Sequence, residues 1–330
     1  MPLPTGIKVG AGGTASAEQP RTTGTASADQ PRKSGTASAE PPRKTATAPA
    51  LAPAAAAGRE FHFTAADFER VRQLIHKHAG ISLAPIKQDM VYSRLARRLR
   101  ALGMKSFDQY LAHLERGHGA EWETFVNSLT TNLTSFFREN HHFEMLQKHL
   151  LRLAQRPIRI WCSAASTGEE PYSLAITACE AFNTLTPPVQ IHASDIDTNV
   201  LKTAAHGEYP LERIERLDAE RQRKYFIKGA GVPTGQVRVR PELQKLITYS
   251  RINLLDAQWP SAKGPFDALF CRNVMIYFDK PTQYQILKKF VPLLHPDGLL
   301  YAGHSESFLH ATDLFRSLGR TVYERTDRRK

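Results

Sequence analysis

The 330-residue sequence predicts an α/β protein: a largely parallel sheet with helices on both faces, a small antiparallel β insert, and a preceding all-α domain. Three observations predict this class. Apolar residues recur at helical spacing from Phe61 to about residue 130, and segments of strand and helix character alternate after Pro157. A stretch of short strands around a Gly/Pro turn then interrupts the alternation.

Residues 1–58 precede these patterns and differ from them in composition. They contain a threefold repeat of eleven residues: GTASAEQPRTT, GTASADQPRKS and GTASAEPPRKT. The repeat has almost no large apolar side chains, so it cannot bury enough surface to offset the entropy lost on ordering. We therefore predict a disordered low-complexity tail over residues 1–58.

An all-α domain is predicted over residues 59–130. Its first helix, FTAADFERVRQLIHKHAG, has Thr64 as N-cap and Gly80 as its stop, and the second, IKQDMVYSRLARRLRALG, ends at Gly103. Two further helical patterns follow, SFDQYLAHLERG and AEWETFVNSLTTNL. A linking helix with the sequence SFFRENHHFEMLQKHLLRLAQ is expected within residues 131–156.

The alternating α/β domain is predicted over residues 157–330. The expected strands are IRIWCSAA, VQIHASDI, ITYSRINLL, FDALFCRNVMIYF and GLLYAGHSE, with TVYERT closing the sheet. The expected helices are PYSLAITACEAF, TNVLKTAAHG and PTQYQILKKFVPLL. KYFIKG, GVPTG and QVRVRPEL predict the β insert at about residues 208–248.

Charge and composition restrict the partners and the compartment. The formal net charge is +12, and the segment from Lys87 to Lys105 holds six basic residues against Asp89, which favours an acidic partner. No apolar run approaches the roughly 20 residues of a membrane span, and the start lacks the apolar core of a secretory signal. We expect a cytoplasmic protein without direct membrane insertion. The three cysteines lack pair or metal spacing, so reduced core thiols and no metal site are expected.

A ligand-binding loop is predicted after the first strand of the α/β domain. The small residues Ala164 to Gly168 are followed by Glu169 and Glu170, at the end of a strand where open α/β sheets bind ligands. A pyrophosphate would favour more glycine amides and no adjacent carboxylate. A carboxylate suits a cationic group such as an ammonium. The alternative is that both glutamates only favour the helix N-terminus.

The ends of the other strands carry side chains suited to a nucleoside. Asp195, in ASDID, is where a ribose hydroxyl pair is typically held, although Asp195 and Asp197 could instead start the next helix. Later strand ends supply Asn253 and Leu254, then Arg272 and Asn273. An amide beside an aliphatic side chain suits the edge and face of adenine. A nucleoside with an amino-acid tail, such as S-adenosylmethionine, fits these features.

Several long motifs resemble those of the CheR-type chemotaxis methyltransferases: TTNLTSFFRE, SAASTGEEPYSLAI, ASDID, INLL, FDALFCRNVMIYFDK and LLHPDGLLYAGHSE. The resemblance covers about residues 60–325. It implies a Rossmann-like domain that methylates receptor glutamates for sensory adaptation and converts S-adenosylmethionine to S-adenosylhomocysteine. It also implies the cofactor-binding residues Asn132, Thr134, Arg138, Glu169, Asp195, Asn253, Leu254, Arg272 and Asn273.

The implied reaction needs positioning more than acid–base catalysis. A glutamate has a reference pKa near 4.3, so it is already ionised at neutral pH and needs no general base. Arg138, expected on one helical face with Thr134, is a candidate to hold the cofactor carboxylate or guide the incoming one. Tyr277 is a candidate to orient a substrate or cofactor oxygen. The alternative for Tyr277 is packing on a neighbouring segment.

The resemblance also implies partners. The helical domain would face the acidic helical cytoplasmic region of chemoreceptors, with Arg94, Arg97, Arg98 and Arg100 as docking residues. The alternative is an ordinary solvated face. Some family members bind a receptor C-terminal tail as a strand added to the β insert, and the turn GAGVPTG is compatible with that mode.

Two other functions stay open from the residues alone. The high net charge suggests a nucleic-acid methyltransferase, but RNVM stands where amino-methylating nucleic-acid enzymes often carry a D/N-P-P-Y pattern. Cys271 also follows Phe270 rather than the proline of cytosine C5 enzymes. We therefore expect no nucleic-acid partner. The other alternative is a non-catalytic scaffold that binds the cofactor and only tethers to receptors.

Overall fold

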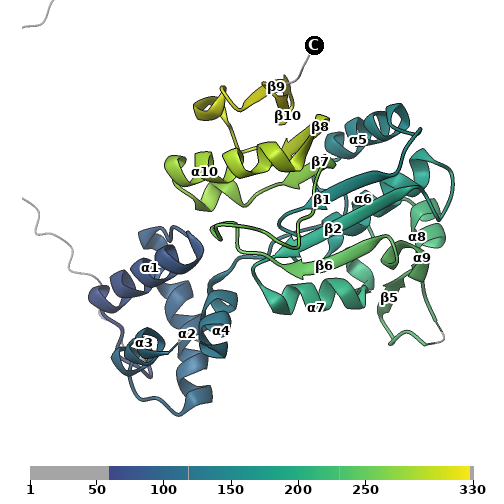
Figure 1. The fold of residues 1–330 in the computed structure, drawn as a ribbon. Coiled ribbons are helices and arrows are strands. Elements are labelled where there is room, and N and C mark those ends of the chain that lie inside the picture. The colour runs from purple at the N-terminus through teal and green to yellow at the C-terminus, as the bar shows by residue number, and fades with distance from the viewer. Residues whose placement is uncertain (1–58, 118, 230, 328–330) are drawn as a thin grey trace, which may run out of the picture. The chain divides into compact units, whose positions relative to one another are not determined.

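The computed structural model describes residues 59–117, 119–229 and 231–327, so the predicted tail over residues 1–58 lies outside the described part. Figure 1 shows the fold. The first helix, α1 (Ala65–Ala79), starts and stops where the sequence predicts. The Thr64 hydroxyl accepts a hydrogen bond from the Asp67 amide, while Asp67 accepts one from the Thr64 amide. Gly80 ends the helix with a φ of 69°, which is a left-handed conformation that favours glycine.

Three more helices complete the all-α domain. They are α2 (Gln88–Leu102), α3 (Phe107–Arg116) and α4 (Ala120–Leu129), and the short turn η1 (Pro85–Lys87) leads into α2. Their apolar faces form a separate core in which Val71, Leu95, Tyr110 and Phe125 are fully buried. The four helices agree with the predicted fold class.

The segment after α4 differs from the prediction. A helix is present only as α5 (His141–Arg152), and residues 131–140 form loop and turn. Phe137 and Glu139 adopt positive φ values of 52° and 58°, which a helix does not allow. The Phe137 amide donates to the Ser173 hydroxyl on another helix, so a tertiary contact replaces the expected helical bond. Thr134 and Arg138 therefore do not share a helical face.

A seven-stranded sheet in the order β6-β2-β1-β7-β8-β10-β9 forms the α/β domain. The strands β1 (Ile158–Cys162), β2 (Val189–Asp195), β6 (Ile247–Arg251), β7 (Phe266–Cys271) and β8 (Leu294–Ala302) run parallel to one another. The strands β10 (Val322–Arg325) and β9 (Phe315–Gly319) add antiparallel pairs at one edge. The strand β10 was predicted from TVYERT, whereas β9 was not predicted.

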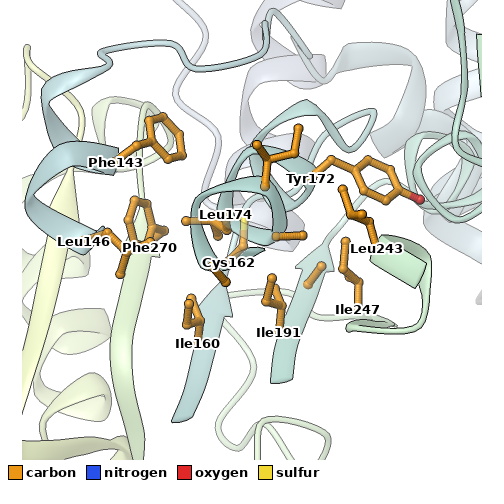
Figure 2. Close-up of a cluster of buried hydrophobic side chains, with 14 of the residues drawn as sticks. Phe143, Leu146, Ile160, Cys162, Tyr172, Leu174, Ile191, Leu243, Ile247 and Phe270 are labelled. Carbon is orange, nitrogen blue, oxygen red and sulfur yellow. The ribbon is translucent and has the colours of Figure 1, made fainter. Parts of the chain in front are cut away.

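Helices cover both faces of the sheet, as predicted. Side chains alternate along the central strand β1, where Ile160 points into one core and Trp161 into the other. The first core contains residues of α5 and α6 (Glu169–Ala181), and Figure 2 shows Phe143, Leu146 and Leu174 gathered over the strands. The second core contains residues of α10 (Lys280–Phe290). The helix α7 (Thr198–His206) contacts β2 and β6.

The β insert forms a separate three-stranded antiparallel sheet in the order β3-β5-β4. Its strands are β3 (Glu208–Pro210), β4 (Phe226–Ile227) and β5 (Gln236–Val239). All three fall within the predicted range of about 208–248. The helices α8 (Ala219–Tyr225) and α9 (Pro241–Gln244), also within that range, were not predicted.

Within the described residues, none of the helices is both long enough and apolar enough to cross a bilayer. The three cysteines are all buried and free of disulfides, as expected of core residues.

Candidate active site

A cavity of about 340 Å³ lies at the carboxyl ends of the parallel strands. Its wall comes from three parts of the chain: residues 79–90 of the helical domain, residues 129–138, and the loops that follow β1, β2, β6 and β7. The predicted residues that line it are Asn132, Thr134, Arg138, Asp195, Asn253, Leu254, Arg272, Asn273 and Tyr277. The structure therefore brings together nine of the ten residues predicted for cofactor binding and catalysis; the tenth is Glu169.

Asp195 ends β2 and is largely buried. Its carboxylate accepts hydrogen bonds from the Ser166 amide at 2.8 Å and from the Asp197 amide at 3.0 Å. Burial raises the pKa of Asp195 to about 6, although the amide donors oppose that rise. Asp197 caps α7 by accepting from the Asn199 amide, which is the simpler role considered for it. The two acids of ASDID thus have different tasks.

Asn132 and Thr134 belong to the loop that replaces the expected helix. The Asn132 side-chain amide donates to Asp197 at 3.0 Å, and the Asn132 backbone carbonyl accepts from the Ser166 hydroxyl at 3.2 Å. The Thr134 carbonyl accepts from Arg213 at 3.2 Å. These bonds fix the loop against the ends of β1 and β2.

Glu169 does not line the cavity. Its side chain is fully buried and accepts a hydrogen bond from the Thr167 hydroxyl at 2.6 Å, and Arg213 lies 3.5 Å from its other oxygen. Its neighbour Glu170 lines the cavity instead and pairs with Arg272 at 2.5 Å. In this geometry a ligand in the cavity meets Glu170, the residue that the sequence analysis did not select.

Arg272 has no exposed side-chain surface and connects two segments of the wall. Besides Glu170, it contacts the Arg138 carbonyl at 2.5 Å and Glu139 at 3.2 Å. Burial disfavours the charged guanidinium, but the two carboxylates outweigh it and raise the pKa of Arg272. The side chain therefore holds the turn at residues 138–139 against the end of β7.

Glu139 was not predicted and lies beside this arginine. It accepts hydrogen bonds from the His304 amide at 3.1 Å and from the His304 ring at 3.0 Å. Burial acts to raise its pKa, but the bonds from His304 and the charge of Arg272 hold the pKa of Glu139 near 2. It stays ionised at neutral pH and links the ends of β7 and β8.

Glu306 is a second buried carboxylate that the sequence analysis missed. One oxygen accepts from the amides of Met275 (2.8 Å) and Ile276 (3.3 Å). The other accepts from the amides of Asn273 (2.9 Å) and Gly303 (2.5 Å). Glu306 thereby orders the loop after β7, in which Asn273 has a φ of 57°. The only sequence signal was a glutamate at the end of an apolar strand, in GHSES.

The helical domain completes the cavity. The Asn253 amide group donates to the His78 carbonyl at 2.9 Å, and its oxygen accepts from the Leu255 amide at 3.0 Å. The Tyr277 carbonyl accepts from the Ser82 amide at 2.9 Å. Both polar ends of the Asn253 side chain are thus engaged within the protein, and α1 is bound to the strand ends.

The four predicted docking arginines have different environments, and none lines the cavity. Arg94 donates to the carbonyls of Ser128 and Thr130 near the end of α4, and Arg98 makes two bonds to Glu121. Arg100 is exposed but pairs with Glu60.

The Arg97 side chain is exposed and makes no hydrogen bond or ion pair with any residue in the described ranges. Lys87, at the start of α2, does line the cavity. Docking by the four arginines stays a prediction, although two of them, Arg94 and Arg98, also bond within the helical domain itself.

Metal chemistry was not expected. Among the described residues, no group of three or more His, Cys, Asp or Glu side chains could hold a metal ion.

A nucleoside-sized cavity at the carboxyl ends of a parallel sheet, with an acid at the end of β2, defines an α/β protein of the nucleoside-cofactor class. Comparison with known families identifies the particular class. Residues 132–324 match the SAM-binding domain of the CheR methyltransferases, and residues 66–130 match the all-alpha domain of the same enzymes. The chain belongs to the CheR methyltransferase family, and S-adenosylmethionine is its cofactor.

Individual relatives of the chain support the same family assignment. The chain is 55% identical to Chemotaxis protein methyltransferase 2 of Pseudomonas aeruginosa, over 80% of this chain and 95% of that protein. It is 53% identical to the Chemotaxis protein methyltransferase of Salmonella typhimurium, over 78% and 89% of the two chains. The corresponding protein of Escherichia coli is 52% identical over 78% and 90%. This chain is thus an S-adenosylmethionine-dependent methyltransferase of the chemotaxis type.

Proposed function

We propose that this enzyme transfers a methyl group from S-adenosylmethionine to glutamate side chains of chemoreceptors in the cytoplasm. The products are glutamate methyl esters, used in sensory adaptation, and S-adenosylhomocysteine. One observation carries the choice of acceptor: among the residues that the structure describes, the cavity wall contains no histidine, and its two carboxylates, Glu170 and Asp195, already accept hydrogen bonds within the protein. Such a site suits an acceptor that arrives already ionised.

The cofactor fits the donor set of the wall. Asp195 offers a carboxylate to ribose hydroxyls, and Leu254 offers an apolar surface to the adenine face. Glu170 offers negative charge to an ammonium, and Arg138 offers a cation to the cofactor carboxylate. Asn132, Thr134, Arg272 and Asn273 order the loops around these groups, and Asn253 attaches α1. Glu169 would support the loop from beneath, through the hydrogen bond that it accepts from the Thr167 hydroxyl.

The chemistry requires in-line positioning and exclusion of water. S-adenosylmethionine supplies a methyl group on a positively charged sulfur, which a carboxylate can attack without losing a proton. The protein would orient that carboxylate with Lys87, Arg138 and the Tyr277 hydroxyl, all of which line the cavity. These groups stabilise negative charge on the acceptor as it loses its hydration.

Receptor docking would use α2. Arg97 lies roughly 15 Å along the helix from Lys87, at about 1.5 Å per residue. Both cations lack a partner among the described side chains, so both are available to an acidic helical surface. A receptor tail could also add a strand beside β3 or β4, the outer strands of the insert.

The decisive experiment incubates the full chain with methyl-labelled S-adenosylmethionine and receptor-containing membranes, then treats the product with mild alkali. Volatile methanol identifies a carboxyl ester and supports the proposal. Alkali-stable label on added RNA or DNA would support a nucleic-acid methyltransferase instead. Cofactor binding without any transfer would support a non-catalytic scaffold.

A further inference from the structure

We propose that a group of exposed side chains at the cavity is the surface that recognises the uncharged residues around the acceptor glutamate. The group consists of Lys87, Leu133 and Ile276, which line the cavity, and of Ile86, which directly precedes Lys87 in the chain; we call it the rim. This inference rests on the function proposed above and deepens it. It assigns recognition to apolar contacts at the mouth, in addition to charge along α2.

The rim residues are unusually exposed for their type. Ile86, Leu133 and Ile276 are 88%, 78% and 50% exposed. In the ranges that the structure describes, only eight large apolar side chains are exposed; two of them line this one cavity, and a third, Ile86, is next to the lining residue Lys87 in the chain. Single exposed apolar residues are common on protein surfaces, whereas a group around a cavity marks a contact site.

These three side chains contribute little to the buried cores. Among the described residues, none of the three is one of the buried or partly buried side chains that make up the three hydrophobic cores. Their neighbours do: Ile81, Phe136 and Val274 each join one of the cores. Leu133 and Ile276 instead line the cavity, and Ile86 directly precedes Lys87, which also lines it.

Position determines what must cover the rim. The methyl acceptor has to enter the cavity through its mouth, so the segment that carries the acceptor must lie against the residues there. Lys87 provides a cation without a partner among the described side chains, and a glutamate carboxylate complements it. The three apolar side chains favour uncharged neighbours around that glutamate.

A helix presents such a surface. Residues three and four positions before and after a helical glutamate share its face, so they meet the rim when the glutamate enters. The occupant is therefore a helix whose glutamate has small or apolar neighbours on the same face. Ile276 is held for this contact by its own backbone, since its amide donates to the buried Glu306 at 3.3 Å.

The test compares rim variants with matched surface variants of the full chain. The rim variants are Leu133→Ser, Ile276→Ser and the double variant Ile86→Ser with Leu133→Ser. The controls are Leu309→Ser (80% exposed) and Leu151→Ser (52% exposed), neither of which lines the cavity. The substrate is receptor-containing membrane from an Escherichia coli strain without its own methyltransferase, with labelled S-adenosylmethionine as donor.

We expect the double variant to raise KM for receptor about tenfold, roughly the effect of one aliphatic side chain no longer buried. Its kcat and its Kd for S-adenosylhomocysteine, measured by calorimetry, should stay within twofold of wild type. The controls should change none of the three quantities. Lysine in the receptor three or four positions from the glutamate should raise KM for wild type more than for the double variant.

Two results overturn the rim alone: a KM in the rim variants equal to that of the controls, or a parallel loss of S-adenosylhomocysteine affinity, which would assign these side chains to the cofactor. A wild-type chain that binds S-adenosylhomocysteine but transfers no methyl to receptor overturns the proposed function, and the rim inference with it. The activity of wild type therefore separates the two failures.

Discussion

Replacing Glu306 with glutamine keeps the size of the side chain but exchanges one acceptor oxygen for an amide donor. In the wild-type structure the two oxygens accept from four backbone amides, two on each oxygen. The glutamine retains one acceptor, so two of the four buried amides lose their partner and face an N–H group instead. The variant therefore tests how strongly this carboxylate orders the loop after β7.

The magnitude follows from those contacts. An unsatisfied buried amide costs about 1–3 kcal/mol, so two such amides cost about 2–6 kcal/mol in free energy of unfolding if the loop keeps its shape. If the loop moves instead, Asn273 and Arg272 move with it, and the cofactor site loses affinity. We expect both effects in part: a loss of at least about 2 kcal/mol in stability, and at least about a tenfold weaker affinity for S-adenosylhomocysteine, at about 1.4 kcal/mol per factor of ten.

Urea unfolding measures the first quantity and calorimetry with S-adenosylhomocysteine the second. Glu144→Gln, on the exposed side of α5, is the matched control and should change neither. If Glu306→Gln keeps both the stability and the affinity of wild type, the four amide bonds do not organise the site. Loss of stability with unchanged affinity would mean that Glu306 acts on the fold but not on the cofactor loop.

Three more predictions concern single contacts. Burial raises the pKa of Asp195 to about 6, and a protonated acid accepts hydrogen bonds poorly, so the affinity for S-adenosylhomocysteine should fall towards tenfold per pH unit as the pH drops below about 6. Calorimetry should show this fall in wild type but not in Asp195→Asn. An equal slope in both proteins would assign the titration to another group. Gly303→Ala should lower the free energy of unfolding, measured by urea denaturation, by about 1–3 kcal/mol, because the new Cβ would lie 2.2 Å from the side-chain nitrogen of Asn273. Unchanged stability would mean that the Asn273 side chain moves away freely. Arg97→Glu should lower receptor methylation while changing stability by less than about 0.5 kcal/mol. Arg94→Gln should instead lower the thermal midpoint, because it removes bonds to two carbonyls. The assignment of docking to Arg97 would be refuted if Arg97→Glu lowered the thermal midpoint and left methylation unchanged.

The sequence predicted those parts of the fold whose signals are local. Thr64 and Gly80 mark the ends of α1 because capping depends on a few adjacent residues. Alternation of strand and helix predicted the parallel sheet, and the rule that ligands bind at strand ends predicted the cavity wall. Asp195 and Arg272 were found in this way, since each follows a recognisable strand.

The errors occurred where distant residues decide the conformation. A linking helix was predicted to include residues of the loop at 131–140, but Arg272 holds the Arg138 carbonyl and Ser173 holds the Phe137 amide. Similarly, the partners of Arg94 and Arg98 lie more than twenty residues away, so the sequence pattern gave no sign that these cations are engaged.

The positions of Glu169 and Glu170 relative to the cavity show a different limit of the sequence. Both stand in the first turn of α6, and only the rotation of that turn relative to the sheet determines which side chain meets the cavity. Glu306 shows the same limit, because its role depends on amides of the loop after β7, about thirty residues earlier.

The bonds from Asn253 to the His78 carbonyl and from Ser82 to the Tyr277 carbonyl have a practical consequence for protein engineering. A chimera that exchanges the entire helical module for that of a distant homologue would also replace part of the ligand chamber. Grafts intended to redirect the enzyme to a new receptor should therefore begin beyond residue 90 and retain the native segment from 78 to 90.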